Sequence, residues 1–261
     1  MKHQAKKRFG QNFLIDQSII AKIINAGDFK HNDFVFEIGP GLTALTKPLL
    51  SLLSELNVVE IDNDVIPVLN ELKETSKNHL NIYHQDALKT DFNDLFSKHN
   101  QKAKIIGNLP YNISTPLLIK LIQLTDQINS MIFMLQKEVI DRICATENQK
   151  AYGRLSVIIQ YFCNVQRVVI APPSAFRPQP KVTSEVIKLT PKENRLALID
   201  FKLFETVVRE AFQQRRKTIS NSLKKLISQE ELKNLAIDPK LRAENLNLNN
   251  YVEISNYLAK T

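Results

Sequence analysis

Asn108, Leu109, Pro110 and Tyr111 form the stretch of this chain whose residue types are best suited to chemistry. They follow the apolar run 104–107, so they stand at the end of a predicted strand. Asn108 offers a side-chain carbonyl oxygen as a hydrogen-bond acceptor, and the main-chain carbonyl of Leu109 offers a second. Proline fixes its own φ and disfavours helix at the preceding residue, so the bend is expected to turn the Leu109 carbonyl outward. Tyr111 adds a flat aromatic face.

Two acceptors beside an aromatic ring suit the exocyclic amine of an adenine. The lone pair of that amine is delocalised into the base, so an enzyme that methylates it must hold the amine while an aromatic side chain grips the ring. The alternative is a plain turn between a strand and a helix, because Asn and Pro are common in turns. Short motifs of this kind also occur by chance.

A second motif lies upstream and predicts a nucleotide site. The apolar strand 33–38 is followed by Gly39, Pro40 and Gly41 and then by a helical pattern. Glycine allows a close approach of backbone to ligand, and the start of the next helix favours polar ligand groups. Glu60 ends the next predicted strand, at the distance of about 20 residues that suits a carboxylate for binding ribose hydroxyls.

A third predicted strand leads to Asp86, which could accept a hydrogen bond from a cofactor's adenine amine. The carboxyl ends of the strands line one crevice in a doubly wound sheet, so the glycine turn, Glu60, Asp86 and Asn108 are expected to converge. A dinucleotide oxidoreductase stays open as an alternative. The third glycine of the dinucleotide-binding motif G-x-G-x-x-G would fall at Ala44, and that motif tolerates alanine at this position.

Over nearly its whole length, the chain resembles the ribosomal RNA adenine dimethyltransferases of the KsgA type. Seven motifs carry the resemblance in the same order along the chain. They are Gly10-Gln11-Asn12-Phe13-Leu14, Phe36-Glu37-Ile38-Gly39-Pro40-Gly41, Val59-Glu60-Ile61-Asp62, Gln85-Asp86-Ala87, Asn108-Leu109-Pro110-Tyr111-Asn112-Ile113-Ser114-Thr115, Phe176-Arg177-Pro178-Gln179-Pro180-Lys181-Val182 and Phe212-Gln213-Gln214-Arg215-Arg216-Lys217-Thr218.

The resemblance implies S-adenosyl-L-methionine as cofactor. With the turn glycine Gly41 included, the predicted cofactor contacts are Asn12, Leu14, Gly39, Gly41, Glu60, Asp86 and Asn108. Asn108, Leu109 and Tyr111 are the predicted catalytic group, and the resemblance adds Phe176 as a second stacking surface opposite Tyr111. The alternative for Phe176 is an aromatic residue that pins its loop to the core. Thr43 departs from the glycine found there in many methyltransferases, and its hydroxyl is expected near the methionine tail.

The resemblance also implies the reaction. In this reaction, the N6 amines of two adjacent adenosines are each methylated twice. The adenosines lie in the hairpin loop near the 3′ end of 16S (small-subunit) ribosomal RNA, and the enzyme has a role in small-subunit biogenesis. Two related alternatives remain. One is an Erm-like enzyme that methylates 23S ribosomal RNA, although segment 215–223 looks more like the KsgA type. The other is a non-catalytic ribosome assembly factor.

Composition favours a polyanionic partner. The 261 residues carry a formal net charge of +8, and the pI is near 9.3. Two basic clusters are candidate RNA contacts, Lys6, Lys7 and Arg8 in one and Arg215, Arg216 and Lys217 in the other. A basic solvated surface without a partner is the alternative. The expected partner is small-subunit ribosomal RNA or a 30S assembly particle.

The pattern of elements predicts an α/β fold, with a doubly wound Rossmann-like methyltransferase sheet over 1–190 and a small all-α, RNA-contacting domain over 191–261. Later strands are expected at 131–135, 156–162 and 183–189, the last two joined by a Pro-rich loop. Helices are expected in the second domain at 201–212, 218–227, 229–234 and 249–258.

Other classes of site and location are disfavoured. The two cysteines and five histidines lack metal-ligand spacing, so no metal is expected. The N-terminal region has no continuous apolar segment, and no run approaches the ~20 apolar residues that span a bilayer. We therefore expect a cytoplasmic protein with no membrane contact, acting as a monomer.

Overall fold

The computed structural model describes residues 12–261, which form two compact units. The first contains residues 12–140 and 164–191, and the second contains 141–163 and 192–261. The expected boundary near 190 therefore misses one segment, because 141–163 groups with the C-terminal helices. The basic arm of Lys6, Lys7 and Arg8 lies outside the described residues.

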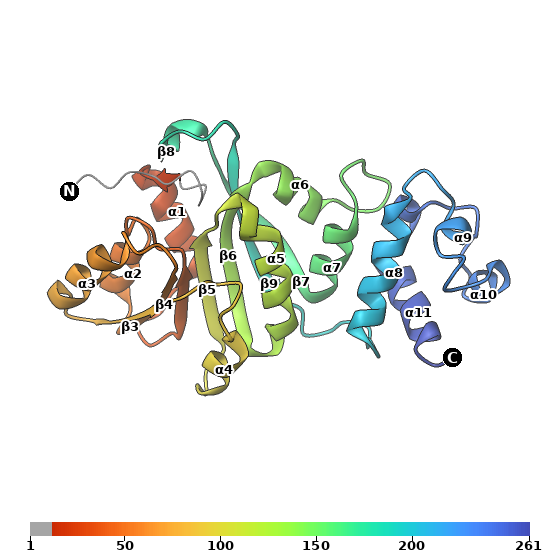
Figure 1. Ribbon diagram of the computed structural model, residues 1–261, viewed down its shortest axis with the longest axis horizontal. Helices are drawn as coiled ribbons and strands as arrows, with labels where there is room; N and C mark the ends of the chain where they lie inside the picture. The colour runs from red at the N-terminus through yellow and green to blue at the C-terminus, as the bar shows by residue number, and fades with distance from the viewer. Residues whose placement is uncertain (1–11) are drawn as a thin grey trace. The chain divides into compact units, whose positions relative to one another are not determined.

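The first unit is built on a seven-stranded sheet in the order β4-β3-β2-β5-β6-β9-β7 (Figure 1). The strands are β2 (Val35–Ile38), β3 (Glu55–Glu60), β4 (His79–His84), β5 (Ala103–Asn108), β6 (Ile128–Gln136), β7 (Cys163–Ala171) and β9 (Ser184–Pro191). Neighbouring strands from β4 to β6 are parallel, and β9 runs antiparallel to β6. This is a doubly wound order, so the carboxyl ends of β2 to β5 meet at one edge.

Helices cover both faces of this sheet. Those wholly or partly in the first unit are α1 (Gln17–Gly27), α2 (Thr46–Leu52), α3 (Ile66–Thr75), α4 (Phe92–Ser97), α5 (Tyr111–Leu121), α6 (Lys137–Cys144) and the 3-10 helices η2 (Ile122–Gln127) and η3 (Pro173–Ala175). Every residue of β2 is buried, as in a strand covered on both sides. Val35 joins the apolar cluster under α1, α2 and α3, whereas the ring of Phe36 contacts Phe92 and Phe96 of α4.

A separate two-stranded sheet joins the start of the described chain to the Pro-rich loop. It pairs β1 (Phe13–Leu14) with β8 (Phe176–Arg177), and Leu14 lies opposite Phe176. Both of these residues are buried in the core cluster of the first unit. Residues 12–14 therefore lie near the carboxyl ends of the parallel strands.

The second unit is helical. It contains α7 (Arg154–Phe162), α8 (Phe201–Gln213), α9 (Ile219–Ser222), α10 (Gln229–Asn234), η4 (Ala243–Asn245) and α11 (Leu248–Leu258). Its core includes Phe204 of α8 and Tyr251 of α11, whose hydroxyl donates to the Ala243 carbonyl. The predicted helix 218–227 is shorter than expected, since only 219–222 is α-helical. No helix within residues 12–261 combines the length and apolar character needed to cross a membrane.

The strand predicted at 156–162 is wrong, because these residues lie in α7 and the strand is β7, which begins at Cys163. A short apolar run rich in Val and Ile fits a buried helix as well as a strand. The helix begins after Gly153, whose N–H donates to the Ser156 hydroxyl at 3.0 Å. Nearly every residue from Ser156 to Phe162 is then buried, so packing overrides the β propensity of the run.

Candidate active site

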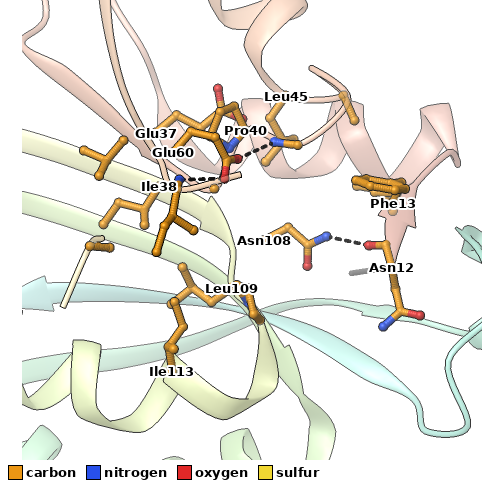
Figure 2. A pocket seen from close by; sticks show the side chains of 18 of the residues that line it. Asn12, Phe13, Glu37, Ile38, Pro40, Leu45, Glu60, Asn108, Leu109 and Ile113 are labelled. Carbon is orange, nitrogen blue, oxygen red and sulfur yellow. Dashed lines mark hydrogen bonds between the residues drawn. The ribbon is translucent and has the colours of Figure 1, made fainter. Parts of the chain in front are cut away.

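One cavity of about 320 Å³ lies at the carboxyl ends of β2 to β5 in the first unit. Ten residues predicted from the sequence as cofactor contacts or catalytic groups line it. They are Asn12, Leu14, Gly39, Gly41, Glu60, Asp86, Asn108, Leu109, Tyr111 and Phe176. Figure 2 shows Glu60 and Asn108 reaching into this space, with Asn12 and Phe13 along one side.

Asn108 is the last residue of β5, and its side chain is oriented by the N-terminal segment. Its amide nitrogen donates to the main-chain oxygen of Asn12 at 3.1 Å (Figure 2). The amide oxygen therefore points away from Asn12 and is placed to accept. The next residue is also fixed, because the Leu109 N–H donates to the Met134 carbonyl of β6 at 3.3 Å. The close packing of β2 against β5 requires Gly107, since a Cβ there would lie 2.5 Å from the Ile38 oxygen.

The two predicted stacking residues differ in exposure. Tyr111 begins α5, is partly exposed and lines the cavity. Phe176 also lines the cavity, but only 1% of its surface is accessible and it belongs to the apolar core cluster. Its packing favours the alternative role, in which the ring pins the Pro-rich loop to the core. A stacking role for Phe176 stays a prediction.

The glycine turn has three residues with left-handed backbone. Their φ angles are +69° at Gly39, +51° at Gly41 and +67° at Thr43. A Cβ at Gly41 would come within 3.2 Å of the Phe13 ring, so β1 packs directly on this turn. Thr43 is buried, does not line the cavity and donates its hydroxyl to the Leu42 carbonyl at 2.6 Å. Its hydroxyl is thus engaged within the turn rather than in the cavity.

Glu60 both organises the turn and faces the cavity. Its Oε1 accepts the N–H groups of Ile61 and Asp62, each at 2.8 Å. Its Oε2 accepts the N–H of Gly41 at the longer distance of 3.4 Å. Burial raises the pKa of Glu60, against the effect of these three backbone donors. A carboxylate has about four acceptor positions, so Oε2 retains capacity for ligand hydroxyls.

Asp86 lies two residues beyond β4, and its Oδ1 accepts the Leu88 N–H at 2.9 Å. The loop that carries Asp86 is held from α5, since the Lys120 ammonium donates to the carbonyls of Leu88 at 2.8 Å and Thr90 at 2.5 Å. Burial lowers the pKa of Lys120, whereas the nearby carboxylates of Asp91 and Asp86 act in the opposite direction.

Phe13 and Glu37 are among the lining residues that were not predicted from the sequence as site residues. Phe13 adjoins the predicted Asn12 and Leu14 but was not singled out, and its ring covers the glycine turn. Glu37 is the one acidic residue in the otherwise apolar strand β2, and this pattern could have identified it as a site residue. Burial raises the pKa of Glu37 to about 8, with the Thr46 hydroxyl opposing the shift and Glu60 adding to it. Its Oε2 has no hydrogen-bond partner among the described residues.

The basic cluster of the second unit is exposed, but its members are not equivalent. Arg215 donates to the carbonyls of Lys150 at 3.1 Å and Tyr152 at 2.8 Å, and it also lies 3.4 Å from a Glu244 oxygen. It therefore fixes two loops of its own unit. The exposed side chains of Arg216 and Lys217 form no hydrogen bond or ion pair with residues 12–261, so they are the freer cations.

The cavity fits S-adenosyl-L-methionine. A volume of about 320 Å³ lies within the usual range for small-molecule sites. Glu60 and Asp86 supply acceptors for hydroxyl and amine groups. The apolar residues Ile61 and Leu88, which closely follow them in the sequence, also line the cavity. Gly39 and Gly41, which have left-handed backbone and no Cβ, let the main chain of the turn lie against a ligand, while Pro40 and Leu42 of the same turn also line the cavity.

Comparisons with known proteins agree with this arrangement. The family model described as Ribosomal RNA adenine dimethylase matches residues 2–260. The chain is 48% identical over 259 residues to Ribosomal RNA small subunit methyltransferase A of Escherichia coli O81 (strain ED1a), covering 99% of this chain and 94% of the relative. The protein of the same name from Shigella flexneri gives the same identity and coverage.

Solved structures are similar over almost the whole chain. A dimethyladenosine transferase from Plasmodium falciparum has a TM-score of 0.80 at 28% identity, covering 95% of this chain and 98% of that one. The 23S rRNA methyltransferase ErmE has a TM-score of 0.71 at 20% identity, covering 95% of this chain and 100% of that one. At that identity the similarity supports the fold alone. The predicted fold class is confirmed. The chain belongs to the ribosomal RNA adenine dimethylase family.

Proposed function

We propose that this protein uses S-adenosyl-L-methionine to dimethylate the N6 amines of two adjacent adenosines. The proposed substrate is the 3′-terminal hairpin loop of 16S (small-subunit) ribosomal RNA within a 30S assembly particle. The observation that supports this most directly is the shared cavity. Glu60 and Asp86, the proposed acceptors for the cofactor's ribose and adenine, line the same cavity as stretch 108–111, the proposed binding site for the target amine.

The chain's own residues bind and orient the target amine. Asn108 presents its amide oxygen because its amide nitrogen is occupied by Asn12, and the Leu109 carbonyl is the proposed second acceptor. Two acceptors on the N–H groups favour a pyramidal nitrogen whose lone pair is available for attack. They also stabilise the positive charge that develops on that nitrogen, as preorganised dipoles do in other enzymes.

When bound, S-adenosyl-L-methionine supplies a methyl carbon attached to a positively charged sulfur. No strong general base is needed among the cavity residues, because the amine becomes acidic only after attack. Orientation and electrostatics are therefore the main contributions of the protein. The partly exposed Tyr111 ring would stack on the base, which repays part of the few kcal/mol needed to take an adenine out of its stack.

Two alternatives are weighed against this proposal. An Erm-like activity on 23S ribosomal RNA has the fold in its favour, but the relatives at 48% identity are named as small-subunit enzymes. A non-catalytic assembly factor would not need the full set of Glu60, Asp86, Asn108 and Tyr111. Family membership weighs against a dinucleotide oxidoreductase. Acting on ribosomal particles, the protein would work in the cytoplasm, and we expect a monomer.

The test is to incubate the protein with labelled S-adenosyl-L-methionine and unmethylated small-subunit particles, and then to map the modified nucleotides. The proposal predicts N6,N6-dimethyladenosine at two adjacent positions in the 3′-terminal hairpin loop. Label found only in large-subunit RNA would support the Erm-like alternative. Cofactor binding without any transfer would support the assembly factor.

A further inference from the structure

The hydroxyl of Tyr111 is engaged by the protein itself. Its oxygen lies 3.0 Å from the Oγ of Ser184, at hydrogen-bonding distance. Ser184 is the first residue of β9 and only 1% of its surface is accessible. The two residues are 73 positions apart in the sequence, so this contact depends on the tertiary fold.

The main chain around Ser184 is held in place by the sheet. It lies opposite Gln136 in the antiparallel pairing of β9 with β6. The residue before it is also fixed, because the Thr183 carbonyl accepts the Lys137 N–H at 3.0 Å. The hydroxyl is therefore carried by a rigid part of the sheet, at the point where the Pro-rich loop re-enters it.

The stretch 108–111 is tied to three different segments. The Asn108 side chain is bonded to Asn12, the Leu109 N–H to Met134 of β6, and the Tyr111 hydroxyl to Ser184 of β9. The first two contacts fix the acceptor groups. The third fixes the far end of the aromatic ring, which would otherwise turn about the two side-chain torsions of a partly exposed tyrosine.

We propose that Ser184 is a positioning residue for methyl transfer, whose hydroxyl holds the Tyr111 ring as the stacking wall for the target adenine. This inference rests on the proposed function, since it takes Tyr111 to contact the base. It assigns the Tyr111 hydroxyl to Ser184 and leaves only the ring face for the substrate. It also gives a physical reason for tyrosine rather than phenylalanine at position 111.

A double-mutant cycle tests the proposal. Ser184→Ala and Tyr111→Phe each remove one partner of the same hydrogen bond, and neither adds atoms. A neutral hydrogen bond corresponds to a loss of roughly threefold to tenfold, so each variant should lower kcat/KM for the RNA by about that factor. The double variant should be no worse than either single variant, because both changes remove one interaction. Tyr111→Ala, which removes the ring, should lose much more.

Two further measurements separate positioning from general destabilisation. The dissociation constant for S-adenosyl-L-methionine, measured by calorimetry, should be unchanged in Ser184→Ala and Tyr111→Phe. Ser255→Ala is the matched control, because it removes another buried hydroxyl, which donates to the Tyr251 carbonyl in the second unit. It should lower the melting temperature while leaving kcat/KM unchanged. Ser184→Thr keeps a hydroxyl and should retain more activity than Ser184→Ala.

The outcomes are distinguishable. Losses that multiply in the double variant would overturn the proposal, as would wild-type kcat/KM in Ser184→Ala together with a strong defect in Tyr111→Ala. If Tyr111→Ala is as active as the wild type, or if the wild type transfers no methyl group to adenosine, the proposed function itself fails.

Discussion

At the scale of single residues, Glu37 makes the stability of the ligand-free protein depend on pH. Its pKa is raised from an ordinary value of 4.5 to about 8 by burial. The folded state therefore holds a proton that the unfolded state releases between these two values. The free energy of unfolding should then fall as the pH rises from about 4.5 to about 8, and change no further above that on account of this group.

Glu37→Gln tests this prediction, because the amide has no proton to lose. The variant should gain stability over the wild type as the pH rises through that window, on the order of a few kcal/mol at its upper end. Urea unfolding at a series of pH values measures the difference. Glu74→Gln, on an exposed position of α3, is the control and should follow the wild-type profile. A difference between Glu37→Gln and wild type that does not vary with pH would show that Glu37 is ionised in the fold.

Glu60 is predicted to act mainly on cofactor affinity. Hydrogen bonds to a charged group contribute about 1.5–3 kcal/mol, so Glu60→Ala should weaken binding of S-adenosyl-L-methionine by roughly tenfold to a hundredfold. The variant also leaves the N–H groups of Gly41, Ile61 and Asp62 without their acceptor, so its melting temperature must be measured beside its affinity. An unchanged dissociation constant from calorimetry would refute the ribose assignment.

At the scale of elements, the glycine turn is strained at one position. Thr43 is β-branched and buried with φ at +67°, a conformation that costs such a residue of order 1–3 kcal/mol. Thr43→Gly should relieve this strain at the entropic cost of a glycine, for a net gain of up to about 1 kcal/mol in the free energy of unfolding. Thr43→Ala keeps the Cβ and should give no such gain. If Thr43→Gly lowers the free energy of unfolding as much as Thr43→Ala does, the packing of the Thr43 side chain outweighs the backbone strain.

The exposed cluster 215–217 makes a prediction about RNA binding. Because Arg215 fixes loops within its own unit, Arg216→Ala with Lys217→Ala is the cleaner variant. If both cations neutralise phosphates, the slope of log affinity against log salt should become shallower by about 0.7–0.9 per contact, with no change in melting temperature. Arg215→Ala should instead lower the stability of the second unit. An unaltered slope in the double variant would remove these two residues from the RNA interface.

Elements differed in how well the sequence predicted them. The strands ending near Ile38, Glu60 and Asn108 were predictable because apolar runs ended at glycine, acidic or Asn-Pro signals. Segment 156–162 was mispredicted as a strand, because a short run of Val and Ile has no periodicity that separates a buried helix from a strand. The predicted domain boundary missed segment 141–163 for a different reason, because its grouping with the C-terminal helices depends on long-range packing.

At the scale of the whole molecule, the site is assembled from segments far apart in the chain. The convergence of Gly39, Glu60, Asp86 and Asn108 followed from the topology of a parallel sheet. The approach of Asn12 to Asn108 across 96 positions, and of Tyr111 to Ser184, depends on side-chain contacts that no local pattern encodes. Asn12 was predicted only through the family resemblance, and the burial of Phe176 was offered only as an alternative.

The central claim is that the oxygen of Asn108 holds the target amine, and single-turnover methyl transfer to unmethylated small-subunit particles by Asn108→Ala tests it most directly. Loss of a preorganised hydrogen-bonding group of this kind typically costs about 10²–10³ in rate. We expect a loss of that order with RNA binding intact, while Asn129→Ala, at an exposed position of β6, transfers methyl groups at the wild-type rate. Wild-type turnover by Asn108→Ala would contradict the mechanism.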